Sequence, residues 1–428
     1  MSTQARALLE SLFRAAVGVA HPSGALPPNL PPPPQRGRLI ILAAGKAAGS
    51  MTEVAESHYL ARLPESRLAG IAVTRHGYGR RTRHIPVVEA GHPVPDEAGL
   101  AGTERALALA GAADADDLVL VLLSGGASAN WIAPAAGLSL AQKQAVTRAL
   151  LRSGAAIGEM NTLRKHLSRI KGGRLARHAY PAKLVTLAIS DVPGDDPAVI
   201  GSGPTVPDPT TLEDARAIVG RFRLELPEAV TRALNDPANE SPKPGDQIFA
   251  GSDYRIVARP ADALRAAAER ARAAGYECLV LGDRIQGEAR EVAAEHAHLA
   301  RTLGMQRRKT AILSGGELTV TLRGNGKGGP NQEYALALAI HLEGAPGIAA
   351  LAADTDGTDG GGGRPDDPAG AFVDASTLMR ARAHGLDAAA FLANNDSTGF
   401  FNGIGDLFAP GPTFTNVTDF RAIVVDTP

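Results

Sequence analysis

The chain has 428 residues, a formal net charge of -1 and 4% aromatic residues. At roughly 150 residues per domain, this length predicts two or three domains. The balanced charge excludes a global basic field for nucleic acid or a membrane surface, and the few aromatic residues disfavour a stacking platform for single strands. Cys278 is the single cysteine, which excludes an intrachain disulfide and a cysteine-rich zinc site and makes a cytoplasmic location the expectation.

The first 38 residues predict a helix followed by a connector. Between residues 8 and 16 apolar side chains recur at helical spacing, and charged residues interrupt any continuous core of a signal sequence. The segment from His21 to Arg38 is rich in proline and is expected to be extended. No stretch approaches the roughly 18 to 20 apolar residues of a membrane span, so no membrane partner is expected.

Residues 1–240 are predicted to form a larger, Rossmann-like α/β domain. Short apolar runs, glycine turns and helices alternate in "RLIILAAGKAAGSM", "DDLVLVLLSGGASAN" and "AKLVTLAISDVPGDD". This alternation is typical of a three-layer fold with a mostly parallel sheet, whose ligands bind at the carboxyl ends of the strands. The polar segment from Leu234 to Gln247 is predicted to be the linker that ends this domain.

Residues 250–428 are predicted to form a second, smaller three-layer α/β domain, whose last segment could pack back on the first domain. A strand followed by a Ser-Gly-Gly turn is predicted twice, at Ser124–Gly126 and at Ser314–Gly316. Because each domain then offers a glycine turn, the active site is expected in a cleft between the two domains.

Gly45 and Lys46 follow a predicted buried strand and partly resemble a phosphate-binding loop. The full Walker pattern fails, because Ile40 stands where glycine is required and Ala47 where Ser or Thr is required. What remains is a cation beside a helix amino terminus at the end of a parallel strand, which favours an anion. A solvated surface lysine is the alternative interpretation.

The stretch from Ser190 to Thr211 holds four aspartates, among glycines and prolines that fix the backbone: Asp191, Asp195, Asp196 and Asp208. Rigid acidic loops suit hard cations or a proton-accepting carboxylate, but aspartate is also an ordinary turn residue. The adjacent "GSGPT" exposes amides and hydroxyls without long side chains, and this favours the functional interpretation.

A second acidic stretch runs from Ala352 to Gly363 and contains Asp354, Asp356 and Asp359. It lacks the closing glutamate of a calcium-binding EF-hand, so Mg²⁺ or substrate hydroxyls are the better candidates, and Glu317 could join them or simply solvate its turn. His92 and His166 are single histidines; either could be a base, but a structural or surface role is the favoured interpretation.

Gly324, Gly326 and Gly329 form a G-x-G-x-x-G pattern. The preceding "ELTVTLR" alternates polar and apolar residues like a half-exposed strand, whereas a dinucleotide fingerprint follows a central buried one. Lys327 and Arg323 make the loop cationic and suited to phosphate, and a hairpin loop without a ligand is the alternative.

Taken in order, the motifs resemble the type 2 glycerate kinases from about Lys46 to Asp419. The motifs that carry the resemblance are "AAGKAAGSM", "GHPVPD", "LLSGGASA", "KHLSRIKGGRLA", "SDVPGDDPAVIGSGPTVPDPTT", "SGGELTVTLRGNGKGGPNQE", "DTDGTDG" and "GPTFTNVTDF". The resemblance implies two α/β domains, ATP and Mg²⁺ as requirements, and D-glycerate as the acceptor that becomes 2-phosphoglycerate. It leaves homo-oligomer formation open.

The expected site follows from these motifs. Lys46, Asp191 and Asp354 are predicted to be catalytic, and Glu317 and Asp195 are predicted metal ligands. The predicted nucleotide- or substrate-binding residues are Gly45, Ser124, Gly125, Gly126, Ala127, Ser190, Ser202, Gly203, Ser314, Gly315, Gly316, Lys327, Gly328, Asn331 and Asp356.

One departure from the family pattern concerns Pro330, because many relatives have arginine directly before "NQE". Any phosphate contact of that arginine would have to come from Arg323 or Lys327.

Two other functions compete with the kinase. An NAD(P)-dependent hydroxypyruvate reductase is supported by the glycine pattern alone, and a non-catalytic sensor of a hydroxy acid would need no chemistry. The glycine turns, lysines and carboxylates favour phosphoryl transfer, which depends on positioned charges more than on a covalent intermediate.

Overall fold

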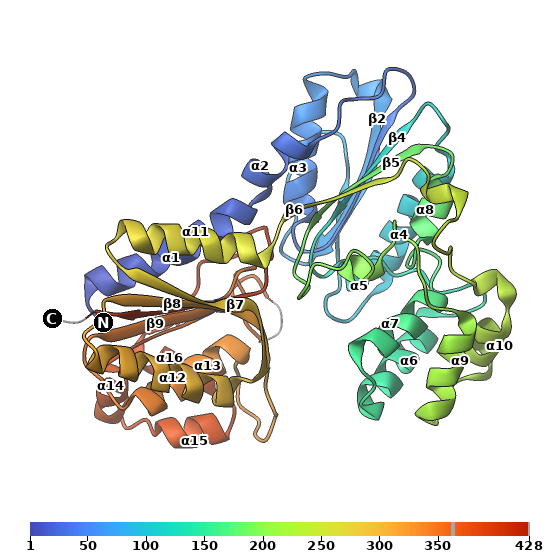
Figure 1. Ribbon diagram of the computed structural model, residues 1–428. Helices are drawn as coiled ribbons and strands as arrows, with labels where there is room; N and C mark the ends of the chain where they lie inside the picture. The colour runs from blue at the N-terminus through green and yellow to red at the C-terminus, as the bar shows by residue number, and fades with distance from the viewer. Residues whose placement is uncertain (361–363, 427–428) are drawn as a thin grey trace. The chain divides into compact units, whose positions relative to one another are not determined.

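The computed structural model describes residues 1–360 and 364–426, which form two compact units (Figure 1). Unit 1 combines Met1–Gly24 with the chain from Ala258 onward, and unit 2 consists of Ala25–Val257. The last three glycines of the second acidic stretch, Gly361–Gly363, lie outside the described residues.

This grouping differs from the predicted division at the amino terminus. Helix α1 (Thr3–Ala20) packs against α11 (Pro260–Ala273), so the first residues belong to unit 1 although they precede unit 2 in the chain. The apolar face predicted for α1 is the cause, because Leu9, Leu12 and Phe13 are buried there.

The grouping also corrects the predicted linker. The segment from Leu234 to Gln247 lies inside unit 2, where the Arg174 guanidinium donates to the carbonyl of Asn239. Unit 2 continues as far as Val257, within the edge strand β6 (Asp253–Ala258). The polar composition of this segment serves buried hydrogen bonds and not a flexible connection.

Unit 2 is built on a six-stranded sheet with the order β3-β2-β1-β4-β5-β6. The pairs β3-β2, β2-β1, β1-β4 and β4-β5 are parallel, and this order is that of the Rossmann fold. Strands β1 and β4 are buried along their whole length, as their apolar sequences predict. The strands besides β6 are β1 (Leu39–Ala44), β2 (Leu68–Arg75), β3 (Val87–Ala90), β4 (Leu118–Leu123) and β5 (Lys183–Ile189).

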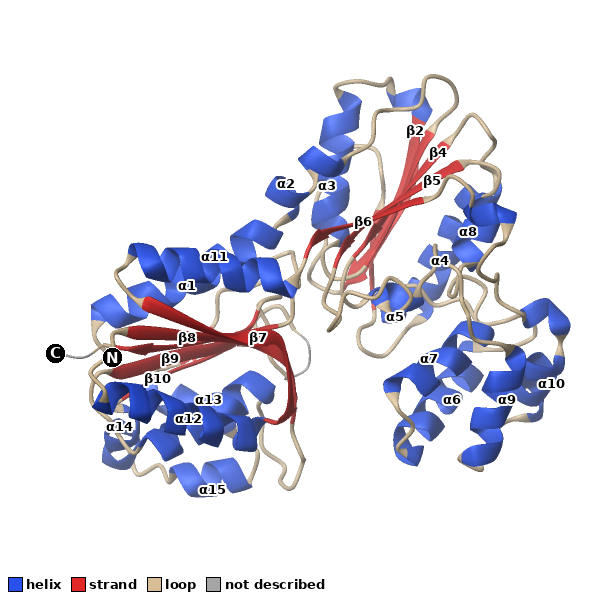
Figure 2. Ribbon diagram, in the orientation of Figure 1, coloured by secondary structure: helices blue, strands red, loops and turns tan. Residues whose placement is uncertain are grey.

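Helices cover both faces of this sheet, and four of them form a core of their own (Figure 2). The sheet is flanked by α3 on one face and by α4 and α8 on the other, while α6, α7, α9 and α10 pack together around Leu150 and Leu163. The helices are α2 (Pro22–Ala25, at the unit boundary), α3 (Ala48–Leu60), α4 (Glu97–Gly111), α5 (Ala127–Asn130), α6 (Leu140–Ser153), α7 (Ile157–His166), α8 (Arg174–Ala179), α9 (Leu212–Arg221) and α10 (Glu228–Asn235).

Unit 1 has a six-stranded mixed sheet with the order β11-β10-β9-β12-β8-β7. Only the pair β7-β8 is parallel among the described pairs of this sheet. The last strand lies between β9 and β8 in this sheet, where its Phe420 contacts Phe13 of α1, a helix within the predicted first domain. The strands are β7 (Glu277–Glu288), β8 (Thr310–Thr319), β9 (Ile348–Asp354), β10 (Gly370–Asp374), β11 (Leu407–Phe408) and β12 (Asp419–Val425).

Unit 1 is also layered. Helices α1 and α11 lie on one face of its sheet, and the remaining helices lie on the other (Figures 1 and 2). These remaining helices are α12 (Ala289–Met305), α13 (Pro330–Leu342), α14 (Thr377–Ala383), α15 (Ala388–Ala393) and α16 (Ser397–Ile404). Both units therefore have the α/β architecture that the sequence predicts.

The second Ser-Gly-Gly segment is not a turn. Ser314–Gly316 lies in the middle of β8, where Gly316 pairs with Asp419 of β12. Gly316 has a φ of 105°, and a Cβ atom there would lie 2.4 Å from the amide nitrogen of Ile285. Glycine leaves room here for the backbone of β7, whose pairing with β8 shifts in register, and it does not end the strand.

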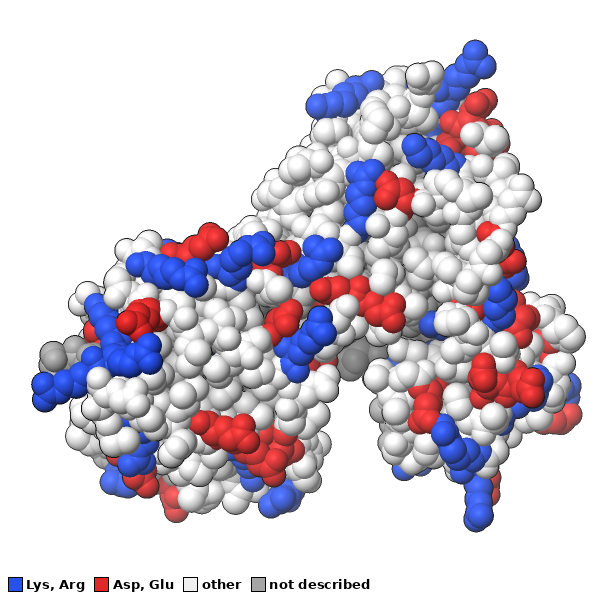
Figure 3. Space-filling view, in the orientation of Figure 1, with Lys and Arg blue, Asp and Glu red and all other residues white. Residues whose placement is uncertain are grey.

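The surface shows no one-signed patch on the face that Figure 3 presents, because acidic and basic side chains are mixed on each unit. None of the helices in the described part of the chain combines the length and the apolar character that a membrane crossing requires.

Candidate functional site

The turns after β1 and β4 are joined by hydrogen bonds. The N–H of Lys46 donates to the carbonyl of Gly125 at 2.7 Å, and the N–H of Ala47 donates to Oγ of Ser124 at 2.9 Å. Gly45 has a φ of 115°, and a Cβ atom there would lie 2.4 Å from the carbonyl oxygen of Ser124. β1 and β4 are the neighbours between which the strand order reverses, which is where α/β sheets bind ligands.

Lys46 is half-buried at this position and lies two residues before the start of α3. Its side chain passes close to Gly126, because a Cβ atom on that glycine would lie 3.3 Å from Cγ of Lys46. Lys46 and Gly126, which are about 80 positions apart in the chain, are therefore neighbours in space. The amino end of α3 adds a favourable potential for an anion.

The turns after β5 join the same edge of the sheet. Ser190 directly follows β5, and Asp191 comes next and is half-buried. Oγ of Ser202 lies 2.7 Å from Oγ of Ser128, which follows the predicted residue Ala127 in α5. This contact connects the segment of Ser202 and Gly203 to the segment after β4.

Sequence reasoning missed Lys171, which supports this connection. Its Nζ donates to the carbonyl oxygen of Ser128 at 2.6 Å, and the side chain is buried. Burial, and less strongly the charge of Arg164, lowers the pKa of Lys171 to about 7. Its place in "KHLSRIKGGRLA", a stretch with many cations beside paired glycines, is the signal that could have found it.

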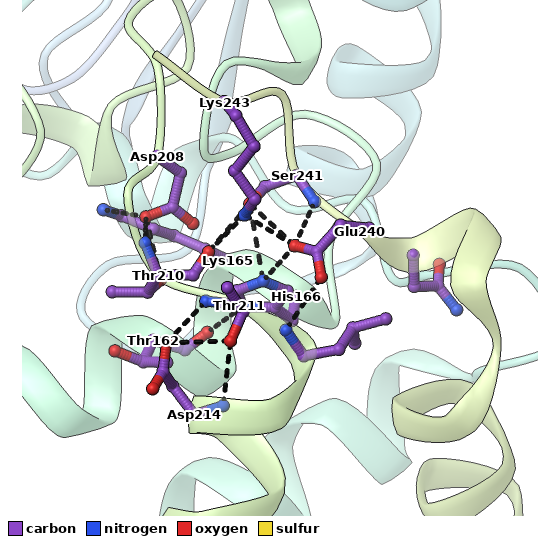
Figure 4. Close-up of polar contacts among 12 residues, drawn as sticks. Thr162, Lys165, His166, Asp208, Thr210, Thr211, Asp214, Glu240, Ser241 and Lys243 are labelled. Atoms are coloured by element: carbon purple, nitrogen blue, oxygen red, sulfur yellow. Dashed lines mark hydrogen bonds and ion pairs between the residues drawn. The ribbon is translucent and has the colours of Figure 1, made fainter.

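The aspartates of the stretch from Ser190 to Thr211 have different surroundings in the structure. Asp208 pairs with Nζ of Lys165 at 3.3 Å, and it accepts from the hydroxyl of Thr210 at 2.8 Å (Figure 4). Burial raises the pKa of the Asp208 carboxyl, but the nearby Lys165 and the hydrogen bonds from Thr210 outweigh burial and lower it. Asp208 thus has a structural role, and Asp195 sits in a turn with a φ of 58°.

His166 also has a structural place, in agreement with the favoured interpretation. It is fully buried, with Nδ1 at 2.9 Å from the carbonyl oxygen of Thr162 and Nε2 at 3.1 Å from Oε1 of Glu240 (Figure 4). Burial raises the pKa of Glu240, but hydrogen bonds from Leu212 N–H, Lys243 and His166 outweigh burial and lower the pKa to about 2. This cluster fastens the segment after α10 onto α7.

The G-x-G-x-x-G segment of unit 1 is hydrogen-bonded to another segment of the same unit. Oδ1 of Asn395 accepts the N–H groups of Arg323 and Gly324 at 2.7 and 3.0 Å. The carbonyl of Asn394 accepts the N–H of Gly326 at 2.9 Å, and a Cβ atom on Gly326 would lie 2.3 Å from Cβ of Asp396. The glycines therefore allow close packing against the segment 394–396.

Lys327 and Gly328 continue this contact. The N–H of Lys327 donates to Oδ1 of Asp396 at 3.1 Å, and a Cβ atom on Gly328 would lie 2.1 Å from Oγ of Ser397. The side chain of Lys327 is exposed. The predicted phosphate loop therefore keeps a cationic side chain, but its N–H groups from Arg323 to Lys327 are hydrogen-bonded within unit 1.

The amino end of α13 is capped by a carboxylate. Asp359 accepts the N–H groups of Asn331 and Gln332 at 3.0 and 2.9 Å. Pro330 stands in the first turn, where a missing N–H costs no hydrogen bond. Burial raises the pKa of Asp359 to about 7, although these hydrogen bonds lower it.

The second acidic stretch gathers at one edge of the unit 1 sheet. Asp354 ends β9 directly opposite Asp419, and Nδ2 of Asn331 donates to Oδ1 of Asp419 at 2.7 Å. Asp356 is buried and accepts the N–H of Thr358 at 2.8 Å, so its carboxylate shapes the turn. Asn331, Asp354 and Asp356 thus lie in one region of this unit.

Ser314 and Gly315 belong to a buried network that the sequence did not reveal. Arg421 is 1% exposed and donates to Oγ of Ser314 at 3.3 Å, to the carbonyl of Gly315 and to Oδ2 of Asp419 at 3.0 Å. A charged residue inside the otherwise apolar "DFRAIVV" was the available signal. Glu317, two residues beyond Gly315, is exposed.

The two predicted metal ligands belong to different units, Glu317 to unit 1 and Asp195 to unit 2. Within residues 1–360 and 364–426, no three side chains of His, Cys, Asp or Glu form a group that could hold a metal ion. The metal ligands therefore stay a prediction.

Two family models match the chain. Residues 8–235 match a family described as "Domain of unknown function (DUF4147)", and residues 310–419 match the MOFRL family.

Similar proteins extend over nearly the whole chain. A protein of Agrobacterium vitis, named on a provisional basis as a hydroxypyruvate reductase, is 49% identical over 98% of this chain and 94% of its own length. The D-glycerate 2-kinase of Thermotoga maritima is 39% identical over 89% of both chains. A crystal structure of glycerate kinase from Thermotoga maritima matches with a TM-score of 0.87 and 36% identity, over 99% of this chain and 100% of that one.

Proposed function

The chain belongs to the family of the type 2 glycerate kinases, and from this membership we propose how its own residues perform the reaction. The activity is ATP-dependent phosphorylation of D-glycerate at the C2 hydroxyl, which gives 2-phosphoglycerate and ADP. A cytoplasmic location fits the single cysteine, Cys278, which is half-buried.

The observation that carries the proposal is the hydrogen-bonded pair of turns at the strand switch point. The turn of Gly45 and Lys46 is fixed to the turn of Ser124–Gly126, so a cation is held beside a glycine backbone. Phosphoryl transfer depends on such positioned charge, because negative charge spreads over the transferred group in the transition state. We assign to Lys46 the neutralisation of that charge.

The acceptor hydroxyl needs a group that orients it for in-line attack. We assign this role to a carboxylate, Asp191 after β5 or Asp354 at the end of β9, because each is half-buried at the end of a strand. Ser124, Ser190, Ser202 and Gly203 are the proposed contacts of unit 2 with phosphate or carboxylate oxygens.

Mg²⁺ is the metal that the family implies, and oxygen ligands are those it prefers. Asp195 and the exposed Glu317 offer carboxylates and so fit it by donor type. When bound, Mg²⁺ would neutralise phosphate charge and hold the phosphates in a reactive geometry.

Pro330 is compatible with this assignment. The carboxylate of Asp359 occupies the amino end of α13, so a phosphate contact there would have to come from an exposed side chain. Arg323 and Lys327 are the exposed cations of the preceding loop.

The hydroxypyruvate reductase alternative rests on the G-x-G-x-x-G pattern and on a provisional name. The pattern is poorly suited to a pyrophosphate, because Asn394, Asn395 and Asp396 take up N–H groups that a dinucleotide would need.

A paired assay on the purified protein tests the proposal. We expect D-glycerate with MgATP to yield ADP and 2-phosphoglycerate, and hydroxypyruvate to cause no oxidation of NADH or NADPH. Nicotinamide oxidation without ADP formation would instead establish the reductase, and silence in both assays would favour a sensor.

A further inference from the structure

The loop that carries His92 is fixed at two points to neighbouring elements of unit 2. It follows β3 and leads into α4, whose first turn is capped by Asp96. The side chain of Asn130 donates to the carbonyl of Gly91 at 3.4 Å, and that of Gln144 donates to the carbonyl of Pro95 at 3.0 Å. His92 thus projects from a loop whose backbone is held on both sides.

The imidazole of His92 lies over Gly126, beside Lys46. A Cβ atom on Gly126 would lie 3.1 Å from Nε2 of His92 and 3.3 Å from Cγ of Lys46. Gly126 has a φ of 84°, a conformation that favours glycine, and the missing side chain leaves room for both neighbours. In the sheet order, β3 is three positions away from β4. The loop after β3 nevertheless reaches the turn that follows β4.

Charged residues of several described elements lie near this loop. Lys46 follows β1, Arg75 ends β2, and Asp96 caps α4 and pairs with Nε2 of His76 at 3.1 Å. Arg75 stacks on the ring of Tyr78 at 4.7 Å. The carboxylate of Asp96 therefore accepts the N–H of Gly99 and pairs with His76. Lys46, a cation, lies beside His92 over Gly126.

We propose that His92 is a catalytic residue of the kinase reaction and receives the proton of the glycerate C2 hydroxyl. The assignment rests on the proposed function, since it needs the reacting oxygen to lie beside Lys46. As the oxygen forms its bond to the γ-phosphorus, the bond from that phosphorus to the bridging oxygen of ADP breaks, and its electron pair leaves with ADP. The hydroxyl proton moves to a ring nitrogen of His92.

Imidazole suits this role better than a carboxylate does. A histidine has an ordinary pKa of ~6.5, close to the working pH, whereas an aspartate with an ordinary pKa of ~3.9 is a weak base there. Asp191 or Asp354 then orients the hydroxyl without removing its proton.

The test compares His92→Gln with His76→Gln in rapid-quench single-turnover assays from pH 5 to 9. The control histidine is 61% exposed in its side chain and contacts the same loop through Asp96. We expect wild type and His76→Gln to lose rate toward acid pH, and His92→Gln to be roughly 10²- to 10⁴-fold slower without that acid limb. Thermal unfolding of each variant checks that the fold is kept.

Three results would overturn the assignment. They are a wild-type rate without an acid limb, a His92→Gln variant that keeps the limb, and a His92→Gln variant that raises KM for glycerate at an unchanged transfer rate. The wild-type profile requires no variant, so the test survives a misfolded His92→Gln. Failure of the wild type to form 2-phosphoglycerate would contradict the proposed function itself and is scored separately.

Discussion

Two glycine-rich segments of this protein look alike in sequence and are used differently. At Ser124–Gly126 in unit 2, Gly126 gives room to the side chains of Lys46 and His92. At Gly324–Gly329 in unit 1, the glycines give room to the backbone of Asn394 and neighbouring residues of the same unit. The first segment leaves room for two side chains beside a turn, whereas the second fastens two parts of unit 1.

The difference shows that glycine spacing by itself does not identify a phosphate loop. Whether such a segment can bind phosphate depends on which groups already accept its backbone N–H hydrogen bonds. In the second segment carboxamide and carboxylate oxygens accept them, so those groups serve the fold. A ligand would have to displace hydrogen bonds that already stabilise the unit.

The largest effect is expected at the first segment. Lys46→Ala should lower kcat by roughly 10²- to 10³-fold, because one preorganised charge beside the transferred group is lost. Steady-state assays with D-glycerate and MgATP measure it. Lys183→Ala is the matched control, because this exposed lysine starts β5, at the end of the strand away from Ser190 and the candidate site. Near-normal turnover of Lys46→Ala would remove Lys46 from the mechanism.

A smaller loss of activity is expected when the space over Gly126 is filled. In Gly126→Ala the new Cβ atom would lie 3.0 Å from Cδ2 of His92, at a φ that disfavours alanine. Displacement of the two side chains should lower kcat by about 10²-fold. An unchanged kcat in this variant would show that the contact over Gly126 does not position His92 or Lys46.

The corresponding change in the second segment should affect stability and spare kcat. In Gly326→Ala the Cβ atom would lie 2.6 Å from Cα of Asp396, so the unfolding free energy should fall by about 1–3 kcal/mol. Urea titration measures this fall. Gly304→Ala in α12 meets only contacts of 3.8 and 4.0 Å and should be neutral or stabilising by about 0.5–1 kcal/mol. A loss of kcat with normal stability in Gly326→Ala would instead mark a ligand loop.

Lys327→Ala separates the side chain of this loop from its backbone. Because the side chain is exposed, we expect less than about a tenfold rise in KM for ATP, as for one surface charge. ATP titration of initial rates measures it. A loss as large as that of Lys46→Ala would make the two segments functionally equivalent and would refute the comparison.

The smallest effect concerns a cluster of unit 2 that is expected to serve stability alone. The pKa of Glu240 is lowered to about 2 from an ordinary 4.5, so its contribution is present above pH 4.5 and is lost as the pH falls toward 2. Tm should therefore fall less steeply over that window in Glu240→Gln than in wild type, and kcat should stay unchanged. Glu228→Gln, at an exposed helix position, should keep the wild-type slope. Equal slopes in all three proteins would contradict the role of Glu240.

The sequence was most informative where local pattern decides structure. β1, β4 and β5 could be predicted because each is a short apolar run between a polar segment and a glycine or acidic turn. Because ligands of such sheets bind at the carboxyl ends of the strands, Gly45 and Ser124 could be placed at one edge from the sequence, and this part of the candidate site was predicted.

The remaining features depend on segments that are distant in the chain. Gly324 meets Asn395 about 70 positions further on, and Arg421 of the last strand contacts Ser314. The place of His92 depends on a β3 loop that reaches over the ends of other strands. A local pattern can mark one residue, such as the charge in "DFRAIVV", but it does not identify the partner, because each pairing is set by topology and not by spacing.

The most direct measurement of the central claim is the position of the new phosphoryl group. Phosphorus NMR of the products from D-glycerate and MgATP should show 2-phosphoglycerate and ADP in equal amounts. The 3-phosphoglycerate isomer, or unreacted ATP beside active nicotinamide chemistry, would contradict the account.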